Sequence, residues 1–258
     1  MTDFRQIYGL PERYFLNLGR MVPKKNLSML VSAYARYCQK ADGRDEPLAR
    51  PDHKQADARA ARPYPVALVL VGSGEEEAAL EAHARALGLE VVDHRSAGVS
   101  DSRHSPLVTR HEENRGAVFF YGFRQIEENP VFYALAEAFI LPSLYEEWGL
   151  VVNEAMASSL PVIVSRTAGC AEDLLPACRQ VTSADTENCK LNTENSLELR
   201  SNGFVFDPTS VEALSEALKR LASSEERKAM GQSSREIIGR WGCDNFARQA
   251  LRAAQTAS

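Results

Sequence analysis

The sequence of 258 residues has few cysteines, and none of them are paired at a spacing typical of a metal or redox motif. The cysteines are five in number, an odd count, and no C-x-x-C occurs. They are Cys38, Cys170, Cys178, Cys189 and Cys243. This pattern argues against a disulfide framework and against a zinc site, so we expect reduced thiols and no bound metal.

Long apolar runs and an excess of positive charge are also missing. We find no signal peptide and no apolar stretch of membrane length, which predicts a cytoplasmic protein without a transmembrane segment. The formal net charge of −5 gives no reason to expect a nucleic-acid partner. With 44% hydrophobic and 25% charged residues, the chain can build one substantial core.

The most informative stretch is AFILPSLYEEWGLVVNEAMASSLPVIVS, which carries two glutamates eight positions apart, Glu146 and Glu154. AFILP has the character of a buried strand, and LVVNEAMA has helical spacing with Gly149 at its start. Ser143 lies in the loop between them and is a candidate donor-binding residue. Such a junction is where open parallel α/β sheets bind ligands, so we expect both carboxylates to face the same crevice.

The start of this predicted helix could hold a phosphate through the backbone N–H groups of Gly149, Leu150 and Val151. Glu154 would then accept hydrogen bonds from two adjacent hydroxyls of a ribose, and Glu146 would address a sugar on the other side of a diphosphate. A simpler alternative is that the paired glutamates only cap the helix and complement its dipole.

The same stretch resembles the E-x7-E signature of retaining glycosyltransferases of family 4, which have the GT-B fold. Its usual form is an acidic residue, a small residue or Pro, an aromatic, Gly, Leu and a second Glu. The residues that fit are Glu146, Trp148, Gly149, Leu150 and Glu154. Glu147 departs from the pattern, because Pro or Gly is commoner there.

A second match lies in RYFLNLGRMVPKKNLSMLVSAYARY, where a predicted strand ends at Gly19 and Arg20, and Lys25 follows. Gly19 is a candidate donor-binding residue at this strand end. The resemblance implies that Arg20 and Lys25 bind the diphosphate of a nucleotide-sugar donor. Two fixed cations can stabilise a departing diphosphate without a metal ion. The chain contains no D-x-D pair, which suits that mechanism. Taken alone, the two cations would be solvated loop residues.

A third unit, PVALVLVGSGEEEAALEAHARALGLEVV, invites comparison with the dinucleotide fingerprint through Gly72, Gly74 and the later Asp93. Glu77 stands at the third glycine position, where a bulky anion would crowd the turn and repel a pyrophosphate. We therefore rank a nicotinamide-dependent dehydrogenase as the third function. The resemblance implies instead that this glycine loop lines the donor site.

Two further units complete the pattern. A strand ends at Gly122 and Phe123, and the resemblance implies that their backbone contacts the nucleobase, although Phe123 taken alone is typical of a core residue. Another buried strand, PVIVS, leads to Ala168 and Gly169, where the family usually has two glycines. Ala168 leaves the contact of this loop with the donor open.

Five strand-to-helix units predict an α/β fold with a doubly wound parallel sheet, Rossmann-like, the C-terminal half of a GT-B fold. We expect residues 1–258 to form a single nucleotide-sugar (donor) binding domain, with the resemblance covering about residues 10–250. Polar segments at about 41–64, 94–116 and 176–201 are interpreted as loop insertions with little core. Four histidines fall in or beside them and are interpreted as solvated: His53, His94, His104 and His111.

The resemblance implies transfer of a sugar from a nucleoside-diphosphate-sugar with retention of configuration, without a metal or other cofactor. It also implies an acceptor, a glycan or a lipid-linked sugar, bound by an N-terminal domain or partner chain missing from this sequence. Peripheral contact with a membrane would belong to that half. The alternative is a nucleotide-sugar-binding module without transferase activity. UDP is the first expectation for the nucleotide, while the sugar, the acceptor and the oligomeric state stay open.

Overall fold

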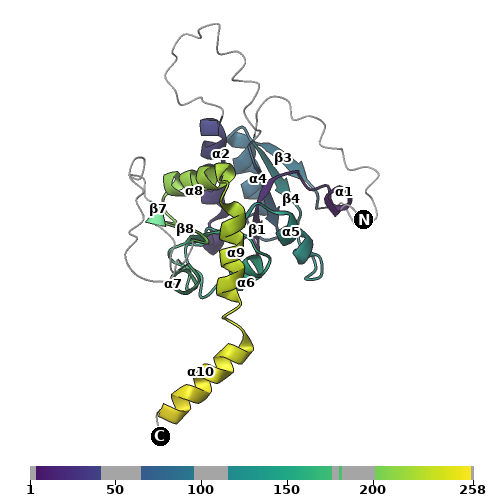
Figure 1. The fold of residues 1–258 in the computed structure, drawn as a ribbon. Coiled ribbons are helices and arrows are strands. Elements are labelled where there is room, and N and C mark those ends of the chain that lie inside the picture. The colour runs from purple at the N-terminus through teal and green to yellow at the C-terminus, as the bar shows by residue number, and fades with distance from the viewer. Residues whose placement is uncertain (1–3, 42–64, 96–115, 176–179, 182–200, 257–258) are drawn as a thin grey trace.

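A computed structural model of the chain describes residues 4–41, 65–95, 116–175, 180–181 and 201–256. Its centre is a sheet with the strand order β3-β4-β2-β1-β5-β6-β8-β7, in which every pairing is parallel (Figure 1). The strands are β1 (Tyr14–Leu18), β2 (Ala67–Val71), β3 (Glu90–Asp93), β4 (Ala117–Phe120), β5 (Ala138–Leu141), β6 (Val162–Ser165), β7 (Gln180–Val181) and β8 (Gly203–Phe206). The predicted doubly wound parallel α/β fold is confirmed.

The strand order reverses direction at β1. The chain first builds outward from β1 through β2 to β3 and β4, and then returns to place β5 on the other side of β1. The loops that follow β1 and β5 therefore leave the same edge of the sheet side by side and continue in different directions. In open α/β sheets this reversal point is where ligands bind.

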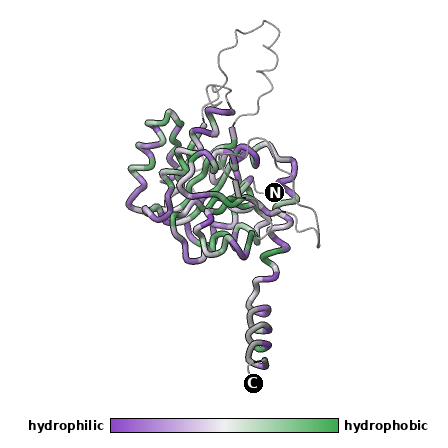
Figure 2. Tube along the Cα trace, turned by 90° about the vertical axis from the view of Figure 1, so that its left-hand side faces the viewer, coloured by the Kyte–Doolittle hydropathy of each residue, from purple (hydrophilic) through white to green (hydrophobic). Residues whose placement is uncertain are grey.

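Helices cover both faces of the sheet (Figure 1). One face packs against α2 (Leu27–Ala41), α4 (Glu77–Ala86) and α8 (Val211–Ser223), and the other against α5 (Asn129–Leu135), α6 (Leu150–Ala157) and α7 (Ala171–Leu174). The other helices of the described residues are α1 (Phe4–Tyr8), the short 3₁₀ turn η1 (Pro23–Lys25), α9 (Arg227–Ile238) and α10 (Cys243–Thr256). Figure 2 shows the hydrophobic segments gathered in the interior of this layered body.

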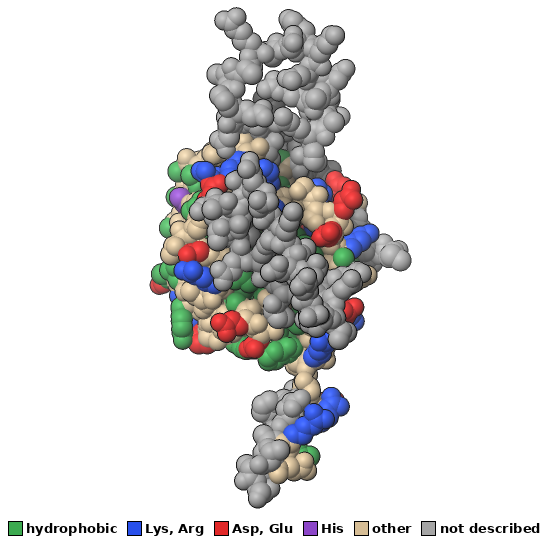
Figure 3. Space-filling view, turned by 60° about the vertical axis from the view of Figure 1, so that its left-hand side comes forward, with side chains coloured by type: hydrophobic (Ala, Val, Ile, Leu, Met, Phe, Trp, Pro, Cys, Tyr) green, Lys and Arg blue, Asp and Glu red, His purple; other side chains and the backbone are tan. Residues whose placement is uncertain are grey.

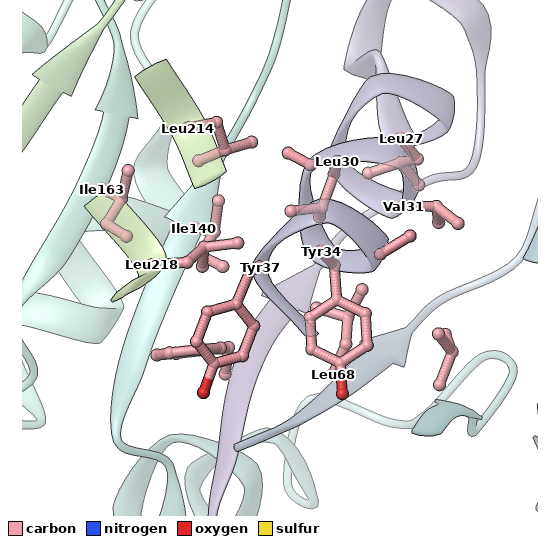
Figure 4. Packing of buried hydrophobic residues seen from close by; sticks show 14 of the residues in the cluster. Leu27, Leu30, Val31, Tyr34, Tyr37, Leu68, Ile140, Ile163, Leu214 and Leu218 are labelled. Atoms are coloured by element: carbon pink, nitrogen blue, oxygen red, sulfur yellow. The ribbon is translucent and has the colours of Figure 1, made fainter. Parts of the chain in front are cut away.

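Alternation along each strand builds the two cores. In β1, Phe15 belongs to the cluster beneath α2 and α8, while Leu16 belongs to the cluster beneath α5 and α6. This is the period-two side-chain pattern of a strand that is buried on both faces. Figure 4 shows the first cluster, where Tyr34 and Leu30 of α2 lie over strand residues such as Leu68. Each fully buried large apolar side chain stabilises the fold by about 1.5 to 3 kcal/mol.

The C-terminal part of the chain leaves the layered body. Helix α10 extends away from the sheet and its flanking helices (Figures 1 and 2). Just before it, Trp241 contacts Trp148, with ring centroids 5.4 Å apart. The segment that leads into α10 therefore touches the loop that joins β5 to α6. Among the described helices, none combines the length and apolar character that crossing a membrane would require.

Two expectations about the polar segments need correction. His94 is not a solvated loop residue, because it is only 5% exposed and its ring stacks on Tyr121, with centroids 4.9 Å apart. Strand β7 lies within the segment interpreted as a loop at 176–201, and it pairs with β8 at the sheet edge. The rest of the three segments falls almost entirely outside the described residues, as do His53, His104 and His111.

Two of the cysteines have described side chains, and both are buried free thiols, Cys38 and Cys170. Burial raises the pKa of the Cys170 thiol to about 12, so it stays protonated at neutral pH. Cys178 and Cys189 lie outside the described residues, and the side chain of Cys243 is not described. The expectation of reduced thiols therefore holds for Cys38 and Cys170 and stays a prediction for the others.

Candidate functional site

The loops after β1 and β5 are joined by an ion pair between Lys25 and Glu146. Both side chains are largely buried, with 17% and 12% of their surface exposed. Beside this pair, Lys24 and Glu147 form a more exposed one, with Nζ and Oε2 3.3 Å apart. The structure thus brings together two residues that the sequence predicted as separate ligands, one for a diphosphate and one for a sugar.

The β1 loop is held in place by Asn26. Its backbone has φ 56° and ψ 35°, a left-handed conformation that Asn tolerates better than most residues. Its side-chain amide donates to the backbone oxygens of Pro142, at 3.2 Å, and Pro208, at 2.9 Å. One side chain therefore connects the loops that follow β1, β5 and β8. Asn26 was not among the residues predicted from the sequence, although an Asn directly after a short Pro-led turn is a signal for this conformation.

Glu146 is supported from two sides. The Ser143 hydroxyl donates to Glu146 Oε2 at 3.3 Å, and the backbone N–H of Gly169 donates to the Glu146 carbonyl at 2.9 Å. A Cβ atom at Gly169 would lie 2.0 Å from the carbonyl oxygen of Glu147, so this close approach requires glycine. Ala168 is buried and forms an isolated parallel bridge with Glu146, so its methyl group fits where the family usually has a second glycine.

Helix α6 begins after Gly149, which has φ 96°, as the sequence predicted. The N-cap residue is Gly149, which has no side chain to cap the helix, and the interpretation that the paired glutamates cap the helix or complement its dipole stays a hypothesis. Within the described residues, the backbone N–H groups of Leu150 and Val151 have no acceptor, as expected for the first turn of a helix. The Leu150 side chain is 68% exposed and stays out of the core.

Glu154 lies in the second turn of α6 and has a different partner from Glu146. Its Oε2 accepts a hydrogen bond from the hydroxyl of Tyr133, at 2.9 Å. Tyr133 is buried in α5, whereas Glu154 is exposed. Tyr133 was not predicted from the sequence, because a tyrosine in an amphipathic helix is typical of a core residue and its partner is 21 positions away.

Three predicted glycines stand at neighbouring strand ends and continue the hydrogen-bond ladder beyond the sheet. The N–H of Gly19, after β1, donates to Val71 O at 2.9 Å, and the N–H of Gly72, after β2, donates to Gly122 O at 2.8 Å. A Cβ atom at Gly72 would lie 2.0 Å from Gly19 O. These backbones therefore approach so closely that a side chain at Gly72 would collide with its neighbour.

Gly74, in the loop after β2, is crowded by backbone in the same way as Gly72. A Cβ atom at Gly74 would lie 2.2 Å from Met21 O, while the Met21 N–H donates to Ser73 O at 3.0 Å. The glycine loop after β2 is thus packed directly on the loop after β1 that carries Arg20. This contact explains the two glycines as a packing requirement and leaves their role in lining a ligand site a prediction.

Arg20 and Phe123 both lie at the surface near the strand ends. Arg20 is exposed, and within the described part of the chain it has no ion-pair partner. Phe123 is 66% exposed, so the interpretation of this residue as core is wrong. Within the described residues neither side chain takes part in an ion pair or is buried in the core, so both are available to contact a ligand.

The dehydrogenase alternative needs Asp93 to bind a ribose. Asp93 instead accepts from Arg95, with Arg95 Nη2 2.6 Å from Oδ2 and Arg95 Nε 2.8 Å from Oδ1. The hydrogen bond from Arg95 lowers the pKa of Asp93 to about 2. Arg95 also bonds Glu77 at 3.2 Å, the residue at the third glycine position. Both features argue against a nicotinamide cofactor at this loop.

The described residues contain no group of three or more His, Cys, Asp and Glu side chains arranged to hold a metal ion. On the face shown in Figure 3, acidic and basic side chains are interspersed over the described surface. That mixture does not resemble the basic stripe of a nucleic-acid interface.

The sequence also matches a known family. Residues 12–224 match the family described as Glycosyl transferases group 1, and the chain belongs to this family. It is 30% identical over 200 residues to sulfoquinovosyl transferase SQD2 of Arabidopsis thaliana, an alignment that covers 73% of this chain and 34% of the relative. It is 25% identical over 172 residues to the uncharacterized glycosyltransferase MJ1607 of Methanocaldococcus jannaschii, covering 66% of this chain and 32% of that protein.

Solved glycosyltransferases share the fold. TarM of S. aureus, in a complex that includes UDP, superposes with a TM-score of 0.59 at 16% identity, covering 93% of this chain and 35% of that one. HepE of Anabaena in complex with UDP gives a TM-score of 0.58 at 18% identity, covering 98% of this chain and 51% of that chain. The fold is therefore the Rossmann-like fold found in GT-B glycosyltransferases. The chain spans about a third of the length of the curated relatives it matches.

Proposed function

We propose that this chain is the donor-binding part of a retaining glycosyltransferase of family 4, which transfers a sugar from a nucleoside-diphosphate-sugar without a metal ion. The observation that carries this proposal is the contact between the loops after β1 and β5, made by Lys25 and Glu146. It places a cation and a carboxylate together at the point where the strand order reverses. A diphosphate joined to a sugar has the two matching chemistries, an anion and a row of hydroxyls.

The proposed catalytic residues are Arg20, Lys25 and Glu146. Arg20 and Lys25 hold the diphosphate and stabilise the negative charge that grows on it as the bond to the sugar breaks. Lys25 exchanges Glu146 for the diphosphate when the donor binds, and Glu146 then accepts hydrogen bonds from the sugar. Metal independence is inferred from these two cations, which take the place of a divalent ion. Retention without a covalent enzyme intermediate is carried over from the family 4 resemblance.

The rest of the donor is assigned along the same edge of the sheet. Glu154 binds the ribose hydroxyls, and the N–H groups of Gly149, Leu150 and Val151 at the start of α6 face a phosphate. The exposed Phe123 and the backbone of Gly122 contact the nucleobase. We favour UDP, and the TarM and HepE structures that share the fold hold this nucleotide.

The acceptor is proposed to bind outside this sequence, in an N-terminal domain or a partner chain. Support comes from the relatives, which are about three times as long as the matched part. Glycans and lipid-linked sugars are the acceptor classes we propose, with transfer in the cytoplasm or at a membrane surface facing it. The single donor domain over residues 1–258 also stays a prediction.

Calorimetric titration with UDP, GDP, ADP and NAD, without added metal, tests the donor site. We expect one nucleoside diphosphate to bind and Arg20→Ala to weaken it strongly. Binding of NAD alone would overturn the proposal in favour of a dehydrogenase. Transferase assays of the chain combined with an acceptor domain then separate an enzyme from a binding module, because the module would bind the nucleotide without turning it over.

A further inference from the structure

Glu154 and Tyr133 differ sharply in their surroundings although they share a hydrogen bond. Tyr133 is 2% exposed, and its ring packs on Phe139 with centroids 5.8 Å apart. Glu154 is exposed at the helix surface, where a free glutamate would sample several rotamers. The 2.9 Å bond between the Tyr133 hydroxyl and Glu154 Oε2 therefore links a fixed group to a side chain that would otherwise move.

The protonation states of the two groups set the direction of this hydrogen bond. Burial raises the pKa of the Tyr133 phenol, and the neighbouring Glu154 carboxylate raises it further. The phenol therefore stays protonated at neutral pH and donates, and the carboxylate accepts. A carboxylate has about four acceptor positions on two oxygens, so donation to Oε2 leaves Oε1 available.

We propose that Tyr133 is a positioning residue that holds the Glu154 carboxylate so that Oε1 accepts hydrogen bonds from the ribose hydroxyls of the donor. The inference rests on the proposed function, because it takes Glu154 as the ribose ligand. A side chain that is already held loses less rotamer freedom when the nucleotide binds. Tyr133 would thus raise affinity without touching the ligand.

The packing of α6 does not depend on this hydroxyl. Val152, Ala155 and Met156 are fully buried and already fix the helix on the sheet. Removing one oxygen from Tyr133 leaves these contacts and the ring contact with Phe139 in place. Loss of the Tyr133 hydroxyl should therefore mainly change the orientation of the Glu154 side chain.

The test compares UDP with 2′,3′-dideoxy-UDP, which lacks both ribose hydroxyls, in titrations of the unaltered chain and of Tyr133→Phe. If the earlier titration selects GDP or ADP, the corresponding pair replaces them. We expect Tyr133→Phe to weaken UDP binding about two- to tenfold, the size of one hydrogen bond. Binding of the dideoxy nucleotide should not change, because no hydroxyl is left for Glu154 to accept from.

A double-mutant cycle adds a second readout. In a Glu154→Gln background, Tyr133→Phe should have no further effect on UDP affinity, because the two residues act as a unit. Tyr34→Phe is the matched control, since the Tyr34 hydroxyl is also buried and bonds the backbone of Ala117 at 3.1 Å. This control should lower stability and leave UDP affinity unchanged.

The outcomes separate the two proposals. If Glu154→Gln weakens UDP binding but Tyr133→Phe does not, the positioning role is wrong and the donor site stands. If Tyr133→Phe weakens the binding of UDP and of the dideoxy nucleotide equally, the hydroxyl supports the fold and not the ribose contact. This result would also overturn the positioning role of Tyr133. If the unaltered chain binds none of the three nucleoside diphosphates, the proposed function fails and this role fails with it.

Discussion

Lys25 and Glu146 form a largely buried ion pair between loops that follow two adjacent strands. The pair neutralises two charges that would otherwise face a donor separately. A diphosphate must therefore displace a carboxylate to reach Lys25, and it then lies beside that carboxylate. Replacing Glu146 should affect the diphosphate and the sugar in opposite directions.

We expect Glu146→Gln to raise affinity for UDP by about two- to tenfold, because Lys25 is released and a repelling charge is removed. The affinity for a UDP-sugar should rise less than the affinity for UDP, since the amide is a weaker acceptor for the sugar hydroxyls. Calorimetry with both ligands measures the difference. Weaker binding of UDP to this variant would contradict the assignment of Lys25 to the diphosphate.

Arg20→Ala should weaken nucleoside diphosphate binding by about 1.5 to 3 kcal/mol, the size of a charge-assisted hydrogen bond. The thermal stability of the Arg20→Ala variant should hardly change, because Arg20 is exposed and has no ion-pair partner within the described residues. Lys24→Ala is the matched control, since it removes the same charge from the same loop but breaks only the exposed pair with Glu147. Equal losses of affinity in both variants would point to general charge rather than a defined contact.

Gly74→Ala should destabilise the fold by about 1 to 3 kcal/mol, the usual cost of overpacking, because its methyl group would collide with Met21 O. The displaced loop carries Arg20, so diphosphate affinity should fall as well. Gly242→Ala is the control, since nothing lies within 4 Å of a Cβ atom there. Denaturant unfolding of both variants provides the comparison, and a Gly74→Ala protein as stable as Gly242→Ala would contradict the packing.

The environment of His94 makes the stability of the folded protein depend on pH. Burial lowers the pKa of His94, with nearby Arg124 lowering it further and Asp93 opposing them. The folded state therefore favours the neutral ring, whereas the unfolded chain takes up a proton near the ordinary pKa of about 6.5. The stabilisation is complete above that value and is lost as the pH falls below it.

Chemical unfolding at pH 7.5 and pH 5.5 measures this effect. We expect the unaltered chain to lose stability over that interval, and His94→Phe to lose less. Phenylalanine keeps the stacking on Tyr121 and Phe119 but cannot titrate. A His94→Phe protein with the same decline would assign the pH dependence to other groups.

Much of the fold could be predicted because the signals are local. Short apolar runs that end at Gly19, Gly72 and Gly122 mark buried parallel strands, and each became a strand of the sheet. Strand β7 could not be predicted, since two residues carry no periodicity and only pairing with β8 defines it. His94 was misplaced for a related reason, because a ring that stacks on distant aromatics cannot be distinguished from a loop residue by its neighbours in sequence.

The candidate site was predicted in part. The strand-end rule located Lys25 and Glu146 at the same edge, but their contact with each other depends on loop geometry that the sequence pattern does not contain. Asn26 and Tyr133 were missed because each acts through a partner far along the chain. The roles of the predicted ligands stay predictions, to be decided by the titrations above.

The contact between Lys25 and Glu146 also bears on how the protein forms. The two residues are 121 positions apart, with β2, β3 and β4 between them. Closing so long a loop is entropically costly and slow, so we expect the ion pair to form after the central strands have assembled. A nascent chain acquires its nucleotide site only after β5 and α6 have emerged, and any shorter N-terminal fragment should be inert toward the donor.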